Sequence, residues 1–187
     1  MQIEKTALEG VLILTPIRHG DNRGFFSESW NRETLRAQGL DYDFVQDNHS
    51  LSAQPGTLRG LHCQLPPRGQ AKLVRCGRGR FFDVAVDIRP GSPGFGQWVG
   101  VDLSFENGRQ LLIPEGFLHG FVTRAPDTEI IYKCTDTYAP DHERTVRWDD
   151  PDLAIDWGLG DRAPVLSARD AAAGPLADLE PYAEVPA

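Results

Sequence analysis

Alternation of hydrophobic and polar residues dominates the middle of the chain. Three segments alternate with a period of two: FFDVAVDIR at 81–89, WVGVDLSF at 98–105 and EIIYKCTDTY at 129–138. In the first, Val84 and Val86 fall on one face, whereas Asp83 and Ala85 fall on the other. A period of two is the signature of β-strands.

Turn signals separate these segments at short intervals, which predicts antiparallel strands in a sandwich or barrel. The signals are PPRG (66–69), RPGSPG (89–94), ENG (106–108), PEG (114–116) and APD (125–127). Helical signals are few: residues 31–39 begin at an Asn N-cap and stop at Gly39, and residues 167–174 begin as a capping box. From about residue 175 the chain reads as a loose tail.

Composition fits one globular domain over residues 1–187, with 40% hydrophobic and 25% charged residues. No apolar run is long enough to span a membrane, and no secretory signal begins the chain. Three cysteines without a CxxC pattern indicate reduced thiols, and we expect a cytoplasmic protein. The net charge of −8 argues against nucleic-acid and anionic-membrane partners.

Positive charge is concentrated in one part of this acidic chain. Residues 48–82 contain no acid, yet they hold Arg59, Arg68, Lys72, Arg75, Arg78 and Arg80. Two interpretations are equally open: a pocket for a small anion such as a phosphorylated ligand, or a solvated basic face paired with acids elsewhere.

Two histidine motifs indicate a cupin-like barrel without a metal. PEGFLHGF (114–121) has the P-x-G-x-x-H pattern of the second cupin motif, and GTLRGLH (56–62) stands where the first belongs. A divalent metal needs three or four converging ligands. Gln64 occupies the position of a second histidine in the first motif, so His62 and His119 are too few.

Alternation also suggests acid–base chemistry inside the barrel. It places Leu58, Gly60, His62 and Gln64 on one face of a strand, and Ile130, Tyr132 and Cys134 on one face of another. A histidine and a tyrosine in one barrel can serve as a base and an acid on opposite sides of a substrate. Strict alternation turns Arg59 away from His62, so both reach one pocket only if Gly60 marks a bulge.

A set of motifs in order along the chain resembles the dTDP-4-dehydrorhamnose 3,5-epimerase family, whose members are cofactorless cupins. The motifs are DNRGFFSESW (21–30), VQDNHS (45–50), LRGLHCQ (58–64), residues 71–93, IPEGFLHGF (113–121), residues 132–151 and LSARD (166–170). The resemblance runs from about Ile3 to Asp170. The resemblance implies a mostly β, cupin-type double-stranded β-helix, or jelly-roll barrel, with a few short helices.

The resemblance implies four catalytic residues. His62 is the base that removes protons beside the C4 ketone of a dTDP-4-keto-6-deoxy sugar, and Tyr132 is the acid that reprotonates from the other face. Asp170 pairs with His62, although it also occupies position N3 of the Ser167 capping box and could only cap a helix. Lys72 stabilises the enolate oxygen. No metal or other cofactor is expected.

Nine further positions are implied to bind or orient the substrate: Arg23, Glu28, Gln46, Asn48, Arg59, His119, Tyr138, Glu143 and Arg169. Arg169 stands where the family pattern leads us to expect lysine. The guanidinium group of arginine would make a bidentate contact in place of the point charge of a lysine. Tyr138 is the candidate for controlling how far the sugar ring turns between two epimerisations. The family also implies a homodimer, formed by sheet extension through an N-terminal strand.

Three functions stay open at this level. The first is the 3,5-epimerase, and the second is a relative that epimerises one carbon or is a ketoisomerase. The third is a non-catalytic cupin that binds nucleotide sugars; the presence of both His62 and Tyr132 argues against it. A metal-dependent dioxygenase is a distant fourth, because the ligand set fails.

Overall fold

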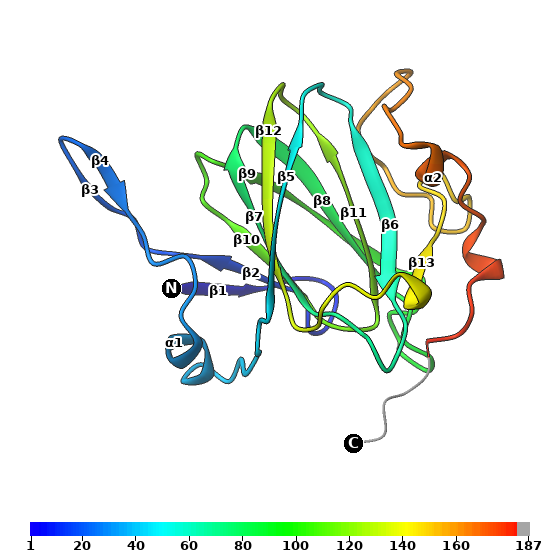
Figure 1. Cartoon of the computed structure of the whole chain (residues 1–187), viewed down its shortest axis with the longest axis horizontal. Coiled ribbons are helices and arrows are strands. Elements are labelled where there is room, and N and C mark those ends of the chain that lie inside the picture. Colours follow the sequence, from blue (N-terminus) through cyan, green and yellow to red (C-terminus); the bar gives the residue numbers. More distant parts are fainter. Residues whose placement is uncertain (183–187) are drawn as a thin grey trace.

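Two antiparallel β-sheets face each other and form most of the protein (Figure 1). The structure is a computed structural model that describes residues 1–182. One sheet has six strands in the spatial order β1-β2-β10-β7-β12-β5, and the other has five in the order β13-β6-β11-β8-β9. The prediction of a mostly β, cupin-type jelly-roll barrel with a few short helices is confirmed.

The elements have the following bounds. The six-stranded sheet contains β1 (Gln2–Lys5), β2 (Leu12–Thr15), β5 (Gln46–Ser52), β7 (Lys72–Arg78), β10 (Gln110–Ile113) and β12 (Thr128–Cys134). The five-stranded sheet contains β6 (Leu58–Gln64), β8 (Arg80–Asp87), β9 (Trp98–Ser104), β11 (Phe117–Thr123) and β13 (Glu143–Thr145). A separate hairpin pairs β3 (His19–Asp21) with β4 (Gly24–Phe26). The helices are α1 (Arg32–Arg36), α2 (Ala168–Ala171) and the 3-10 turns η1 (Pro140–His142) and η2 (Leu176–Asp178).

Both faces of strand β8 are buried. Val84 and Val86 pack on the outer face of the five-stranded sheet, under a covering formed by the C-terminal part of the chain around Trp157. Phe81 and Ala85 pack in the apolar cluster between the two sheets. The face on which the sequence places Asp83 is therefore the interior of the barrel, and its carboxylate is fully buried.

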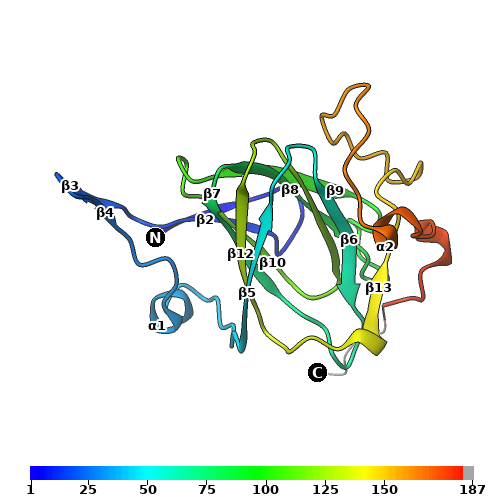
Figure 2. The same ribbon diagram turned by 45° about the horizontal axis from the view of Figure 1, so that its top comes forward.

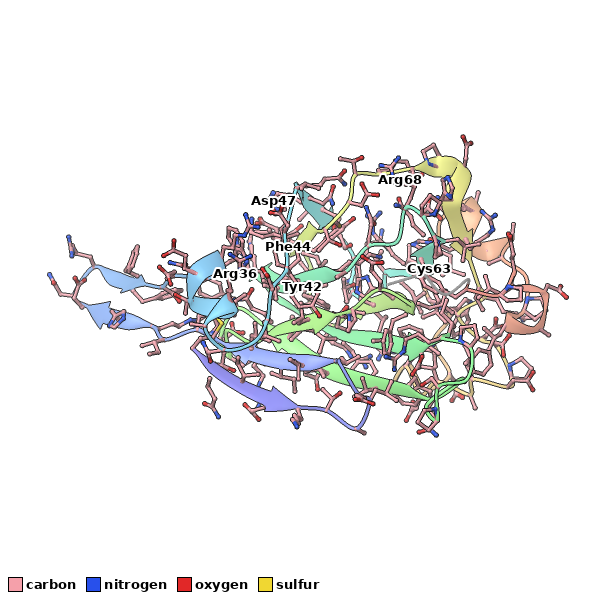
Figure 3. The ribbon with its side chains drawn as sticks, turned by 90° about the horizontal axis from the view of Figure 1, so that it is seen from below. Arg36, Tyr42, Phe44, Asp47, Cys63 and Arg68 are labelled. Carbon is pink, nitrogen blue, oxygen red and sulfur yellow. The ribbon has the colours of Figure 1, made fainter. Side chains whose placement is uncertain are left out.

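A third apolar cluster lies on the outer face of the six-stranded sheet. Leu35 of α1 covers Leu73 and Leu112 there, and the stacked rings of Tyr42 and Phe44 pack against the cluster (Figure 3). Helix α1 begins as the sequence predicts, because the Asn31 side chain accepts hydrogen bonds from two backbone N–H groups of the first turn.

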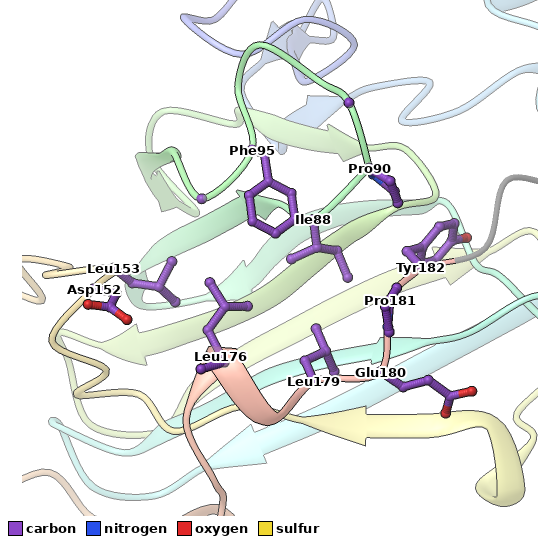
Figure 4. Close-up of a pocket in the computed structure, with 13 residues that line it drawn as sticks. Ile88, Pro90, Phe95, Asp152, Leu153, Leu176, Leu179, Glu180, Pro181 and Tyr182 are labelled. Atoms are coloured by element: carbon purple, nitrogen blue, oxygen red, sulfur yellow. The ribbon is translucent and has the colours of Figure 1, made fainter.

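The expectation of a loose tail from residue 175 is wrong as far as Tyr182. Turn η2 forms there, and Leu176, Leu179 and Tyr182 pack on the outer cluster (Figure 4). Their apolar area is removed from water because the outer face of the sheet exposes a complementary surface. Residues 183–187, also part of that expectation, lie outside the described residues. No helix in residues 1–182 is both long and apolar enough to cross a membrane.

Candidate active site

Figure 2 shows the two sheets facing each other across the interior of the barrel. A polar cavity of about 380 Å³ lies in this interior, and both sheets contribute side chains to its walls. The six-stranded sheet provides Gln46, Asn48, Lys72 and Tyr132. The five-stranded sheet provides Arg59, His62, His119 and, from β13, Glu143. Tyr138 lines the cavity from the segment between β12 and β13. Nine predicted site residues thus meet in one place.

Strand register explains the first wall. Tyr132 on β12 stands opposite Asn48 on β5, and Cys134 stands opposite both Gln46 and Lys72. Side chains of paired residues in neighbouring strands project from the same face of a sheet. Tyr132 and Lys72 therefore point into the barrel together.

A β-bulge in β6 builds the second wall. His119 of β11 pairs with His62, but Phe121, two residues later, pairs with Arg59, so β6 has one extra residue. Gly60 has φ +117° there, and a Cβ at this position would lie 2.6 Å from the Cα of Gly120. The bulge that a shared pocket requires is therefore present, and Arg59 and His62 line the same cavity. Leu58, predicted on the face of His62, instead packs in the outer cluster, because the extra residue reverses the alternation.

His62 is held by a buried carboxylate. Its Nε2 lies 2.6 Å from Oδ1 of Asp170, whose side chain is only 4% exposed. Asp170 Oδ2 accepts a hydrogen bond from the Ser167 hydroxyl, and the backbone N–H of Gly60 donates to Oδ1. Burial opposes ionisation of Asp170, but the bonds from His62 and Ser167 outweigh it and lower its pKa. Asp170 thus pairs with His62 and also stands at N3 of α2, where its backbone N–H donates to the capping hydroxyl of Ser167.

The neutral forms of two other cavity residues are favoured by burial. Burial raises the pKa of Tyr132, so the phenol keeps its proton at neutral pH. Burial also lowers the pKa of His119, although Nε2 lies 2.7 Å from Oδ1 of Asp83 and that carboxylate acts in the opposite direction. His119 is therefore a neutral hydrogen-bonding group beside the cavity.

Tyr138, Glu143 and Arg169 form a polar network at the open side of the cavity. The Tyr138 hydroxyl donates to Glu143 Oε2 at 2.6 Å, and Arg169 Nη1 lies 2.7 Å from the same oxygen. Burial favours the neutral carboxyl of Glu143, but the bonds from Arg169 and Tyr138 prevail and lower its pKa. Arg169 also donates to Thr145. It acts behind Glu143 and is not among the residues lining the cavity.

Arg23 and Glu28 are not brought to the cavity of their own chain. Arg23 lies between β3 and β4, in a hairpin that projects from the barrel, and its side chain is 84% exposed (Figure 1). Glu28 follows the hairpin and accepts hydrogen bonds from Asn31 and Thr34. Neither lines the cavity formed by the described residues.

Sequence reasoning missed the function of two buried polar residues at the site. Gln64, placed on the face of His62 and noted as a missing metal ligand but given no function, donates to the carbonyls of Arg68 and Thr137 and accepts from the N–H of Ala139. It therefore fixes the segment that carries Tyr138. Asp83 was placed on a strand face without a function; its alternation with Ala85 was the available signal that it faces the barrel interior and His119.

The basic segment 48–82 contributes only part of its charge to this cavity. Arg59 and Lys72 line it, whereas Arg68 forms an ion pair with Asp136. Both interpretations of this segment are thus partly right, because strand alternation distributes its side chains over different surfaces. Among residues 1–182, no three His, Cys, Asp or Glu side chains are grouped closely enough to hold a metal ion.

Comparison with known proteins agrees with this geometry. The family model described as dTDP-4-dehydrorhamnose 3,5-epimerase matches residues 5–178. The enzyme of that name from Salmonella typhimurium is 54% identical over 95% of this chain and 96% of its own length. A Legionella pneumophila dTDP-6-deoxy-D-glucose-3,5-epimerase in complex with dTDP-4-keto-L-rhamnose superposes with a TM-score of 0.91 at 48% identity, covering 96% of this chain and 94% of the other. A 3'-monoepimerase from Streptomyces bikiniensis, in complex with dTDP-quinovose, gives 0.86 at 38% identity, covering 92% and 86%. This chain belongs to the dTDP-4-dehydrorhamnose 3,5-epimerase family and is an isomerase.

Proposed function

We propose that the chain epimerises C3 and C5 of dTDP-4-dehydro-6-deoxy-D-glucose and forms dTDP-4-dehydro-L-rhamnose, a step of dTDP-L-rhamnose biosynthesis. One observation carries the assignment of roles. The His62–Asp170 pair and Tyr132 lie on opposite walls of one cavity, because β6 and β12 belong to opposite sheets. Inversion at carbon requires proton loss on one face and gain on the other, so it needs two such groups.

His62 is the base in this proposal. A C–H bond beside a ketone is weakly acidic, and a neutral imidazole can accept its proton. With the Nε2 proton donated to Asp170, the lone pair of the other ring nitrogen is free to do so. The buried carboxylate fixes the ring and stabilises the imidazolium that forms, in the manner of an aspartate behind a catalytic histidine.

Tyr132 is the acid, and Lys72 stabilises the enolate. Removing the proton places negative charge on the C4 oxygen, and a preorganised cation near that oxygen lowers the barrier. Lys72 lies on the same wall as Tyr132. The carbon centre has the same oxidation state before and after inversion, so the reaction requires no redox cofactor.

Arg59, Gln46 and Asn48 bind the nucleotide part of the substrate, and a homodimer completes the site. Arg59 supplies a positive charge to the cavity, and Gln46 and Asn48 supply amide groups. Arg23 and Glu28 can take part only if the projecting hairpin of one copy reaches the cavity of another. Ile17 and Phe26 beside them, 61% and 72% exposed, offer an apolar surface for that contact.

A single-carbon epimerase is the second candidate, because a 3'-monoepimerase has the same fold. The two functions differ in how many times the ring is deprotonated. Tyr138, which is half exposed at the open side of the cavity and bonded to Glu143, is the candidate residue that limits ring movement.

Proton NMR in D₂O with dTDP-4-dehydro-6-deoxy-D-glucose tests both candidates. We expect deuterium at C3 and C5 with the wild-type protein and a rate reduced about 10²–10⁴-fold with His62→Ala. Label at one carbon would establish the single-carbon epimerase. Unlabelled sugar together with tight binding would leave only a nucleotide-sugar binding protein. The variant Tyr132→Phe separates deprotonation from reprotonation. It should still exchange substrate hydrogen for deuterium on the face of His62, but it should no longer invert the carbon.

A reducing compartment such as the cytoplasm remains our prediction for this chain. Its three cysteines are unpaired and buried. Burial raises the pKa of the Cys63 and Cys76 thiols to about 11, so both stay protonated and unreactive at neutral pH.

A further inference from the structure

Three arginines meet in a second pocket that the epimerase chemistry does not use. This pocket of about 290 Å³ is lined by Arg80, Arg124 and Arg162, together with Gly56 and Thr123. Arg80 begins β8, Arg124 directly follows β11, and Arg162 belongs to the segment after Gly158. None of these residues lines the active cavity.

The second pocket lies on the other side of the five-stranded sheet from the active cavity. Along β11, Leu118 and Val122 pack in the outer cluster, and Arg124 continues that face. Along β8, Val84 and Phe82 pack on the outer side, and Arg80 continues it. Phe121 and His119 alternate with these positions and face the barrel interior. A ligand in the second pocket would therefore be separated from the substrate by the sheet.

The arginines are close to one another and have no carboxylate partner. The backbone N–H of Arg124 donates to the carbonyl of Arg80 at 2.9 Å, which makes the two residues cross-strand neighbours. Like charges on such neighbours destabilise a sheet. Among residues 1–182, no carboxylate oxygen lies within 4.0 Å of a guanidinium nitrogen of these three arginines. Asp102 and Asp156 influence Arg124 only from a greater distance.

Two of the guanidinium groups are held in place by the protein. Arg124 Nη1 donates to the carbonyl of Gly158, and its guanidinium carbon lies 5.5 Å from the centre of the Phe82 ring. Arg162 Nε donates to the carbonyl of Leu159. Each bond occupies one N–H of a group that has five, so most donors remain for a ligand. Burial lowers the pKa of Arg124, and Arg162 and Arg80 lower it further, whereas Asp102 and Asp156 act in the opposite direction.

We propose that Arg80, Arg124 and Arg162 form a second anion site that binds a phosphoryl group, as in inorganic phosphate, pyrophosphate or a nucleotide. Planar guanidinium groups bind phosphoryl oxygens through paired N–H donors, and three of them match the oxygens of a tetrahedral anion. The bound anion would remove the repulsion among the arginines and so stabilise this corner of the barrel.

Thermal unfolding with each anion tests the site. Wild-type protein, Arg124→Gln/Arg162→Gln and the control Arg32→Gln are titrated with phosphate, pyrophosphate, dTMP and succinate at constant ionic strength. All three proteins carry the same active cavity, so anion binding there contributes equally to each, and differences between them report the second site. We expect a saturable rise of the unfolding temperature in wild type and control, with at least about tenfold weaker response in the double variant.

The tested anions identify the ligand class. A stronger response to pyrophosphate or dTMP than to phosphate would assign the site to a diphosphate or a nucleotide. An equal response to succinate, or equal titrations of wild type and double variant, would overturn the proposal. The single variant Arg162→Gln, changed at an exposed side chain, repeats the test if the double variant does not fold. Epimerase activity should stay unchanged in Arg162→Gln. Anion binding is measured by thermal unfolding, so a failure of the second site and a failure of the proposed function can be told apart.

Discussion

At the scale of single residues, Asp170 combines two functions that are usually separate. Its backbone N–H and Oδ2 both contact Ser167, and its Oδ1 holds His62. Asp170→Asn should keep the shape of the side chain but lose the negative charge behind the imidazole. We expect kcat to fall by about 10²–10⁴-fold, since both the tautomer and the imidazolium lose their support.

Ser167→Ala is the matched control for Asp170→Asn. It removes the helix cap and one hydrogen bond to Asp170, and it should lower the free energy of unfolding by about 1 kcal/mol. Because Asp170 keeps its charge and its bond to His62, kcat should fall much less than in Asp170→Asn. Steady-state kinetics and urea unfolding of both variants separate the functions. Equal activity of Asp170→Asn and wild type would show that Asp170 only caps α2.

At the scale of elements, the bulge in β6 decides whether Arg59 and His62 share a cavity. Gly60→Ala would place a Cβ 2.6 Å from the Cα of Gly120 at φ +117°. We expect the free energy of unfolding to fall by about 2–5 kcal/mol, from backbone strain and overpacking together. Folded Gly60→Ala protein should also lose epimerase activity, because His62 would shift.

The control for this prediction is Gly39→Ala, which follows α1. Gly39 also has positive φ, +82°, but a Cβ there would meet nothing within 4 Å. Only the left-handed backbone is penalised, by about 1–2 kcal/mol. If urea unfolding gave the same loss for both variants, close packing at the bulge would not be the cause.

At the scale of the whole molecule, buried carboxylates make stability depend on pH. Asp87 is 1% exposed and accepts hydrogen bonds from Arg89 and Ser92, which outweigh the effect of burial and lower its pKa. Because its unfolded pKa is near 3.9 and its folded pKa lies lower, the unfolded state binds more protons. The contribution of Asp87 to the free energy of unfolding is fully present above about pH 4–5, and it is lost as the pH falls through the folded pKa.

Urea unfolding between pH 6 and pH 2.5 checks the dependence on Asp87. Asp87→Asn should lower stability at pH 6 by about 1–3 kcal/mol and flatten the acid limb. The exposed control Asp178→Asn should keep the wild-type curve. An unchanged acid limb in Asp87→Asn would assign the pH dependence to other carboxylates.

The proposed dimer predicts complementation between inactive chains. In a mixed dimer of Arg23→Ala and His62→Ala, one cavity would combine an intact His62 with the intact hairpin of the other copy. Unfolding and refolding an equal mixture should then restore about a quarter of wild-type activity, given two-fold symmetry. Activity no higher than the sum of the separate variants would mean that the hairpin does not serve a second copy.

The sequence by itself determined central strands such as β8, β9 and β12, and the N-terminal caps of α1 and α2. Period-two alternation and local capping depend on near neighbours, and so does the turn chemistry of glycine. For this reason β8 and the start of α1 were predictable, whereas the bulge at Gly60 could be named only as the condition for a shared pocket. The assignment of roles to His62, Tyr132 and Lys72 rested instead on a resemblance of motifs.

Only the tertiary structure decided which side chains meet. The pairing of His62 with Asp170 joins residues 108 positions apart, and the Asp83–His119 contact depends on the register of β8 with β11. The tertiary structure also places Arg23 and Glu28 away from the cavity of their own chain, and it packs the C-terminal segment against the barrel as far as Tyr182. Long-range register and packing are set by the complementarity of whole faces, which local sequence patterns do not encode.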